Sequence, residues 1–167
     1  MSCKTFVLFA ALVIGMLGPG EHAQAATNTH ATQCGAPIAS FVLTNTTTEV
    51  GTRNTAFVPI PGARFEFTAP ARLTARCYIV KFDASATCGG AAPDNLCYVD
   101  VRDNGNPFDP PGGIGFASDS PLLATHSFEW VERVGSGHHV IVVRFRVANP
   151  ATRFALTGWT MDVEEGN

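Results

Sequence analysis

The chain has 167 residues, of which 46% are hydrophobic and 15% charged, and its net charge is −3. This length suits one domain of ordinary size. The mildly acidic balance argues against a general nucleic-acid binder, which would carry a basic excess. After the N-terminal stretch no apolar run approaches the length of a membrane span, so we expect none.

The N-terminus has the three parts of a secretory signal. Lys4 supplies the positive charge, residues 6–17 form an apolar run, and residues 23–25 (Ala-Gln-Ala) match the small-x-small pattern that signal peptidase cuts. The apolar run is too short to span a bilayer. We therefore expect residues 1–25 to be a signal peptide and residues 26–167 to be one exported domain, secreted or periplasmic.

The cysteine content agrees with export. Cys34, Cys77, Cys88 and Cys97 follow the signal, an even number that suits disulfides in an oxidising compartment. Residues 89–95 form a loop that can turn back and bring Cys88 to Cys97, which leaves Cys34 for Cys77. Four cysteines permit three pairings, so the other two stay open. Zinc binding is the alternative, but no Cys-x-x-Cys or His-x-x-His spacing supports it.

Short apolar runs alternate with turn residues along the rest of the chain, which is typical of an all-β protein. A first strand is expected to begin at residues 41–43, and an apolar segment covers residues 56–60. Further strands are expected at residues 63–68, 72–82, 96–102, 127–134, 140–147 and 154–163. The residues between 103 and 121 form the longest stretch without a strand pattern, and their Asn, Gly and Pro favour turns.

Alternation along a strand predicts which side chains are buried. In the strand at residues 72–82 the expected core face consists of Leu73, Ala75, Cys77 and Ile79. The opposite face of that strand carries Arg72, Thr74, Arg76 and Tyr78. We expect it to be a solvated sheet face, and a surface that binds a sugar or a partner is the alternative. In the last strand the alternation slips by one residue at Gly158, which predicts a β-bulge there.

About eight or nine short strands in one domain predict a single antiparallel β-sandwich of jelly-roll type with two disulfides. Its core is expected to contain Phe65, Phe67, Leu73, Ile79, Val99, Val101, Phe128, Trp130, Ile141, Val143, Phe145, Leu156, Trp159, Met161 and Val163.

Several strand-and-turn patterns resemble known proteins. Residues 61–63 (Pro-Gly-Ala) precede an alternating strand, two cysteines follow a later strand, and the closing strands lie at residues 143–147 and 154–164. Over residues 56–164 the chain resembles small secreted bacterial β-sandwich proteins of uncharacterised function. Its closing strands are similar to those of phage-fibre and TNF/C1q-like jelly-roll domains. The resemblance implies a jelly-roll fold, and it offers no catalytic or binding residue to carry over.

Oxygen-bearing side chains gather near the middle of the chain and form a candidate calcium site. They are Asp100, Asp103, Asn104, Asn106 and Asp109. Calcium takes six to eight oxygen ligands, which loops of this composition can supply. The spacing does not match the EF-hand pattern, and the alternative is an ordinary turn. Calcium is the one cofactor that the sequence suggests.

No catalytic set is recognisable. A G-x-S-x-G elbow is missing, and nothing pairs the carboxylates of Glu66, Glu129 and Glu132. His138 and His139 are adjacent, so on a strand they would face opposite sides and could not easily share a metal. We expect a non-catalytic binding module for a cell-surface polysaccharide or a protein. Two alternatives stay open: a structural subunit of an oligomeric jelly-roll assembly, and a small secreted hydrolase.

Overall fold

The computed structural model describes residues 34–71 and 75–166, and the predicted signal peptide, Arg72, Leu73 and Thr74 lie outside these ranges. The described residues form ten β-strands. They are β1 (Pro37–Asn45), β2 (Val50–Thr52), β3 (Val58–Ala69), β4 (Arg76–Gly90), β5 (Leu96–Asp103), β6 (Asn106–Pro107), β7 (Ile114–Ser118), β8 (Ser120–Val134), β9 (Gly137–Val147) and β10 (Thr152–Gly166).

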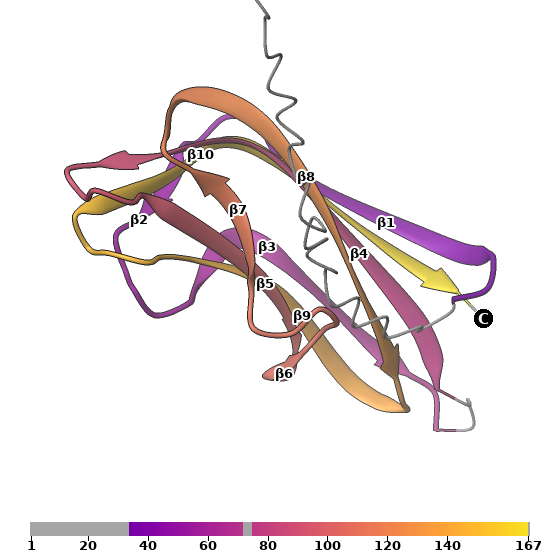
Figure 1. Cartoon of the computed structure of the whole chain (residues 1–167). Helices are drawn as coiled ribbons and strands as arrows, with labels where there is room; N and C mark the ends of the chain where they lie inside the picture. The colour runs from indigo at the N-terminus through magenta and orange to yellow at the C-terminus, as the bar shows by residue number, and fades with distance from the viewer. Residues whose placement is uncertain (1–33, 72–74, 167) are drawn as a thin grey trace, which may run out of the picture.

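The strands build two antiparallel sheets that lie face to face (Figure 1). The first sheet has the order β1-β10-β4-β8, and β2 adds to β10. The second has the order β3-β9-β5, and both β6 and β7 pair with the free side of β5. The eight longer strands are thus divided between the sheets as in a jelly roll. The predicted all-β sandwich is confirmed.

Both predicted disulfides are present. Cys88 of β4 joins Cys97 of β5, and both residues are fully buried. Because β4 and β5 belong to different sheets, this bond crosslinks the two layers through the core. Cys34, just before β1, joins Cys77 near the start of β4. Two disulfides indicate an oxidising compartment.

The face assigned to β4 from the sequence was wrong. The strand runs to Gly90, and from Tyr78 to Cys88 its buried side chains are those at even positions, among them Val80 and Phe82. Of the residues assigned to the core face, Cys77 is buried as expected, in its disulfide with Cys34. Ile79 is only half-buried, on the outer face, and Tyr78 is 3% exposed rather than part of a solvated surface. Because side chains alternate with a period of two, an error of one position inverts every assignment on a strand.

Most of the other expected core residues are confirmed. The buried set contains Val99, Val101, Trp130, Ile141, Val143, Phe145, Leu156, Trp159, Met161 and Val163. Phe128 was wrongly included: it is 40% exposed, although Trp130, two positions further along β8, is fully buried. The predicted bulge is confirmed, since Leu156 pairs with Ala86 and Gly158 with Ser85, which leaves Thr157 as the extra residue.

The stretch between residues 103 and 121 is more ordered than its composition indicated. It contains β6 and β7, and it buries Phe108 and Phe116 in the core.

The closing strands differ from simple hairpins. β8 pairs with β4, β9 with β3 and β5, and β10 with β1, β2 and β4, so consecutive strands cross from one sheet to the other. This crossing leaves the outer strands β1 and β3 facing each other across the open edge of the sandwich.

Candidate functional site

The open edge between β1 and β3 holds a cavity of about 200 Å³, which we call the aromatic cleft. It is lined by Phe41, Phe65, Phe67, Thr68, Ala69, Pro70, Arg76, Tyr78 and Glu165. The cleft exists because β1 and β3 are the outer strands of different sheets, so no further strand covers the rings that point between them. Aromatic lining with a few polar groups is typical of small-ligand sites.

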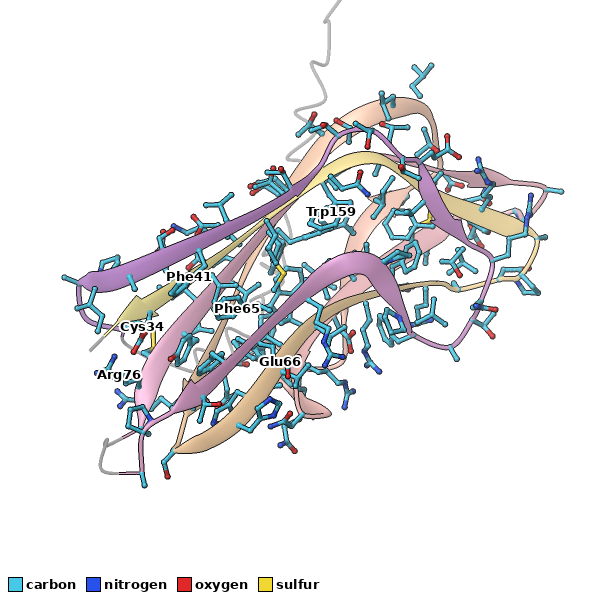
Figure 2. The ribbon with its side chains drawn as sticks, turned by 180° about the vertical axis from the view of Figure 1, so that it is seen from behind. Cys34, Phe41, Phe65, Glu66, Arg76 and Trp159 are labelled. Carbon is cyan, nitrogen blue, oxygen red and sulfur yellow. A yellow bond between two sulfur atoms is a disulfide. The ribbon has the colours of Figure 1, made fainter. Side chains whose placement is uncertain are left out.

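Aromatic rings run without a break from the surface of the cleft to the core. The ring centroids of Phe41 and Phe65 are 4.8 Å apart, those of Phe65 and Phe67 are 5.5 Å apart, and those of Phe67 and Tyr78 are 4.7 Å apart. Figure 2 shows Phe41 and Phe65 pointing toward one another from β1 and β3. Phe41 is 44% exposed, so the run begins in solvent.

An ion pair provides the polar side of the cleft. Arg76, the first residue of β4, donates from Nη1 to Oε1 of Glu165 on β10, and both side chains stay partly accessible. Figure 2 places Arg76 beyond the phenylalanines, near the end of the sandwich where Cys34 lies. The pair supplies donor and acceptor groups next to an apolar surface, and this combination orients a polar ligand in a mainly apolar pocket.

Tyr78 forms the inner wall of the cleft. Its burial raises the pKa of its hydroxyl, and the charge of Asp103 acts in the same direction, while Arg76 opposes both. Because burial penalises the phenolate, the folded protein keeps this proton at a higher pH than the unfolded chain does. Stability is therefore unaffected below the ordinary tyrosine pKa and falls as the pH rises through the raised one.

We expect Tyr78→Phe to reduce the loss of stability in alkali. The unfolded chain releases the tyrosine proton near its ordinary pKa of about 10, so above about pH 10 the wild type should lose melting temperature more steeply than the variant. Melting followed by circular dichroism between about pH 9 and about pH 11 measures this slope. Tyr98→Phe is the matched control, and equal slopes for wild type and Tyr78→Phe would contradict the prediction.

A buried histidine and aspartate lie behind the cleft. Nδ1 of His139 is 2.7 Å from Oδ2 of Asp103, and Nε2 is 3.0 Å from the carbonyl oxygen of Gly135. The backbone N–H of Val140 donates to the other carboxylate oxygen of Asp103, and Phe67 stacks on the imidazole at 5.1 Å. Both ring nitrogens are thus occupied by acceptors within the fold. The pair ties β5 to β9 and offers no free base to a substrate.

The five residues of the candidate calcium site are not brought together. Asp100 binds arginines on the outer face of the second sheet, whereas Asp103 faces inward to His139. Asn104 donates to the carbonyl of His138, Asn106 lies exposed in β6, and the backbone of Asp109 bonds to Val131 of β8. Among residues 34–71 and 75–166 no group of three or more acidic, His or Cys side chains is placed to hold a metal ion. Calcium binding stays a prediction.

The adjacent histidines face opposite ways, as their position in a strand predicted. His139 is buried, while Nε2 of exposed His138 lies 2.8 Å from Oε1 of Glu66. Hydrogen bonds from Arg64 and then from His138 lower the pKa of Glu66. Glu66 is therefore engaged in surface ion pairs with Arg64 of β3 and His138 of β9.

The aromatic cleft was not recognised from the sequence. Alternation did place Phe65 and Phe67 on one face, and both were assigned to the core. How much of each ring is exposed depends on which strand of the other sheet lies opposite it, and the local sequence pattern does not contain that information. The two tryptophans, in contrast, are buried as expected.

No protein-family model matches the sequence, and no curated protein does. A similar solved structure is the "EclA C-terminal domain; sugar-binding protein", at 15% identity over 92% of this chain and 96% of that chain, with a TM-score of 0.37. A TM-score this low carries no argument about the site. No helix long and apolar enough to cross a membrane occurs in the described part of the chain.

Proposed function

We propose that the protein is a secreted, non-catalytic binding module that takes one sugar unit of a cell-surface polysaccharide into the aromatic cleft. The observation that carries this proposal is the run of partly exposed rings, Phe41, Phe65 and Phe67, beside the ion pair of Arg76 and Glu165. Rings of this kind bury the apolar face of a sugar, and the charged pair can bond its hydroxyls.

The size of the cleft favours a sugar unit over a larger ligand. Pockets for drug-sized molecules have volumes of about 300–1,000 Å³. The aromatic cleft, at about 200 Å³, fits one ring-sized group. A single pocket this small gives weak affinity, so a polymer that offers many copies of the same unit suits it better than a free monosaccharide.

The proposal is tested with a glycan binding screen on residues 26–167, prepared with both disulfides formed. Wild type is expected to bind, and Phe41→Ala is expected to bind more weakly on the order of tenfold, because it removes the solvent-facing ring of the run. Phe128→Ala is the matched control. Phe128 is 40% exposed against 44% for Phe41 and also contacts one other aromatic ring, but it lies on β8, away from the cleft.

Failure of the folded protein to bind any glycan would overturn the proposal. Equal binding by wild type and Phe41→Ala would exclude the aromatic cleft as the binding site.

Two further measurements test the other predictions. Repeating the screen with calcium and then with EDTA tests whether the loop from Asp100 to Asp109 binds calcium. Light scattering on the same samples tests the alternative of an oligomer subunit. That alternative has support in the exposed apolar side chains of β8, which are those of Leu122, Leu123 and Phe128.

A further inference from the structure

The outer face of the second sheet concentrates arginines. Alternation on β9 turns Arg144 and Arg146 outward, away from the buried valines and Phe145. The register of β5 against β9 sets Asp100 opposite Arg144 and Tyr98 opposite Arg146, with Arg102 on the same face of β5. We call these five residues the arginine face.

This face has more positive than negative charge. Asp100 is 2% exposed, and its carboxylate accepts two bonds from Arg144, at 2.9 and 2.5 Å, and one from Nε of Arg102 at 3.2 Å. One carboxylate thus balances two guanidinium groups. Arg146 has no carboxylate partner among the described residues, so three arginines face a single acid. On a chain whose net charge is −3, such a patch attracts anions locally.

Aromatic rings hold Arg146 in place. Its guanidinium carbon lies 4.1 Å from the ring centroid of Tyr98 and 5.0 Å from that of Phe57. The ring of Phe57 is itself seated against Gly113, where an added Cβ would come within 2.4 Å of it. Within the described residues the Arg146 side chain donates one hydrogen bond, to the carbonyl of Val147, and it is long at 3.4 Å. The guanidinium is therefore oriented in advance while most of its N–H groups remain available, which suits two-point binding of an oxyanion.

A groove lies beside these arginines on the same face. Its volume is about 210 Å³, Val140, Val142 and Pro59 contribute apolar surface to it, and Arg102 and Arg144 also line it. An apolar surface next to guanidinium groups suits a ring that carries an acidic substituent. Arg144 and Arg146 are two positions apart on one strand, hence separated by about 7 Å. Cations repeated at this interval match a chain of repeated anions better than one isolated ion.

We propose that the arginine face binds an acidic polysaccharide through its carboxylate or sulfate groups, at a site separate from the aromatic cleft. The cleft opens at the edge between β1 and β3, whereas this site covers the outer surface of β9 and β5. Single-stranded nucleic acid fits the face less well, because guanidinium groups already cover the rings of Tyr98 and Phe57 that bases would stack on.

The test measures binding of the disulfide-bonded chain, residues 26–167, to polygalacturonate, dextran sulfate, neutral dextran and single-stranded DNA. Arg146→Gln is expected to weaken binding to the acidic polysaccharides about tenfold, because it removes a charged donor without leaving a buried acid unpaired. Arg146→Lys keeps the charge but loses the planar fork, and an intermediate affinity is expected. Added salt should weaken the wild-type interaction. Tighter binding to polygalacturonate would identify the carboxylate as the group that the arginines bind, and tighter binding to dextran sulfate would identify the sulfate.

Arg153→Gln is the matched control, since Arg153 is an exposed arginine of the first sheet that pairs with Glu49. It should bind like wild type. The proposal is overturned if neither acidic polysaccharide binds, if Arg146→Gln binds them as wild type does, or if DNA binds more tightly than both. Phe41→Ala should retain acidic-polymer binding, and Arg146→Gln should retain whatever binding the aromatic cleft provides, so failure at one site is distinguishable from failure at the other.

Discussion

Trp130→Ala is expected to lower the free energy of unfolding by about 3–5 kcal/mol. Trp130 is completely buried on the inner face of β8, where it pairs with Val80 of β4 and contacts the ring of Phe128 at 5.2 Å. Alanine removes the whole indole and leaves a cavity that the surrounding sheet positions can close only in part. A loss of this size is a large fraction of the 5–15 kcal/mol typical of a domain.

Trp130→Phe separates the loss of volume from the loss of the indole N–H. That N–H is buried and has no hydrogen-bond partner among residues 34–71 and 75–166, so its removal relieves a desolvation cost. We therefore expect Trp130→Phe to lose much less stability than Trp130→Ala. Urea unfolding followed by circular dichroism measures both variants. A loss below about 1 kcal/mol for Trp130→Ala would contradict the large-to-small expectation.

Removal of the disulfide between Cys34 and Cys77 is expected to cost about 4 kcal/mol in the chain-entropy picture. This bond joins residues 43 positions apart, whereas the bond between Cys88 and Cys97 joins residues 9 positions apart. Because the entropy lost by the unfolded chain grows with loop length, the shorter loop contributes less, about 3 kcal/mol.

The paired alanine variants test this ranking by urea unfolding of the purified proteins. Cys34→Ala with Cys77→Ala is compared with Cys88→Ala and Cys97→Ala, so that neither variant leaves a free thiol. A loss below about 1 kcal/mol for the first variant would contradict the loop-length argument. A larger loss for the second would show that its position between the two sheets outweighs its short loop.

Some of the fold could be predicted because it depends on short segments. The alternation at residues 140–147 assigned Ile141, Val143 and Phe145 to the core, and the slip at Gly158 located the bulge of β10. The loop between Cys88 and Cys97 is short, and its length favoured their pairing over the two alternatives. In each case the deciding residues lie within about ten positions of one another.

Local alternation did not assign the faces of β4 correctly. Read only as far as residue 82, its apolar residues fit either face, and the wrong face was chosen. The whole strand extends to Gly90, and its even positions from Val80 to Cys88 pack against the opposite sheet. Phe128 was also misjudged, because alternation gives it the same face of β8 as Trp130 and does not tell how far along the strand the core extends.

The sequence by itself determined the class of the fold, the bulge and the buried face of β9, because these follow from the period of a strand, and it favoured the observed disulfide pairing over the two others. Only the tertiary structure decided the candidate sites. The aromatic cleft requires β1 and β3 to be the outer strands of facing sheets, and the arginine face requires Asp100 to meet Arg144 from 44 positions away. The neighbours of a strand depend on how all strands of the chain pair. That pairing decides whether an aromatic ring is covered and whether an arginine lies beside a carboxylate.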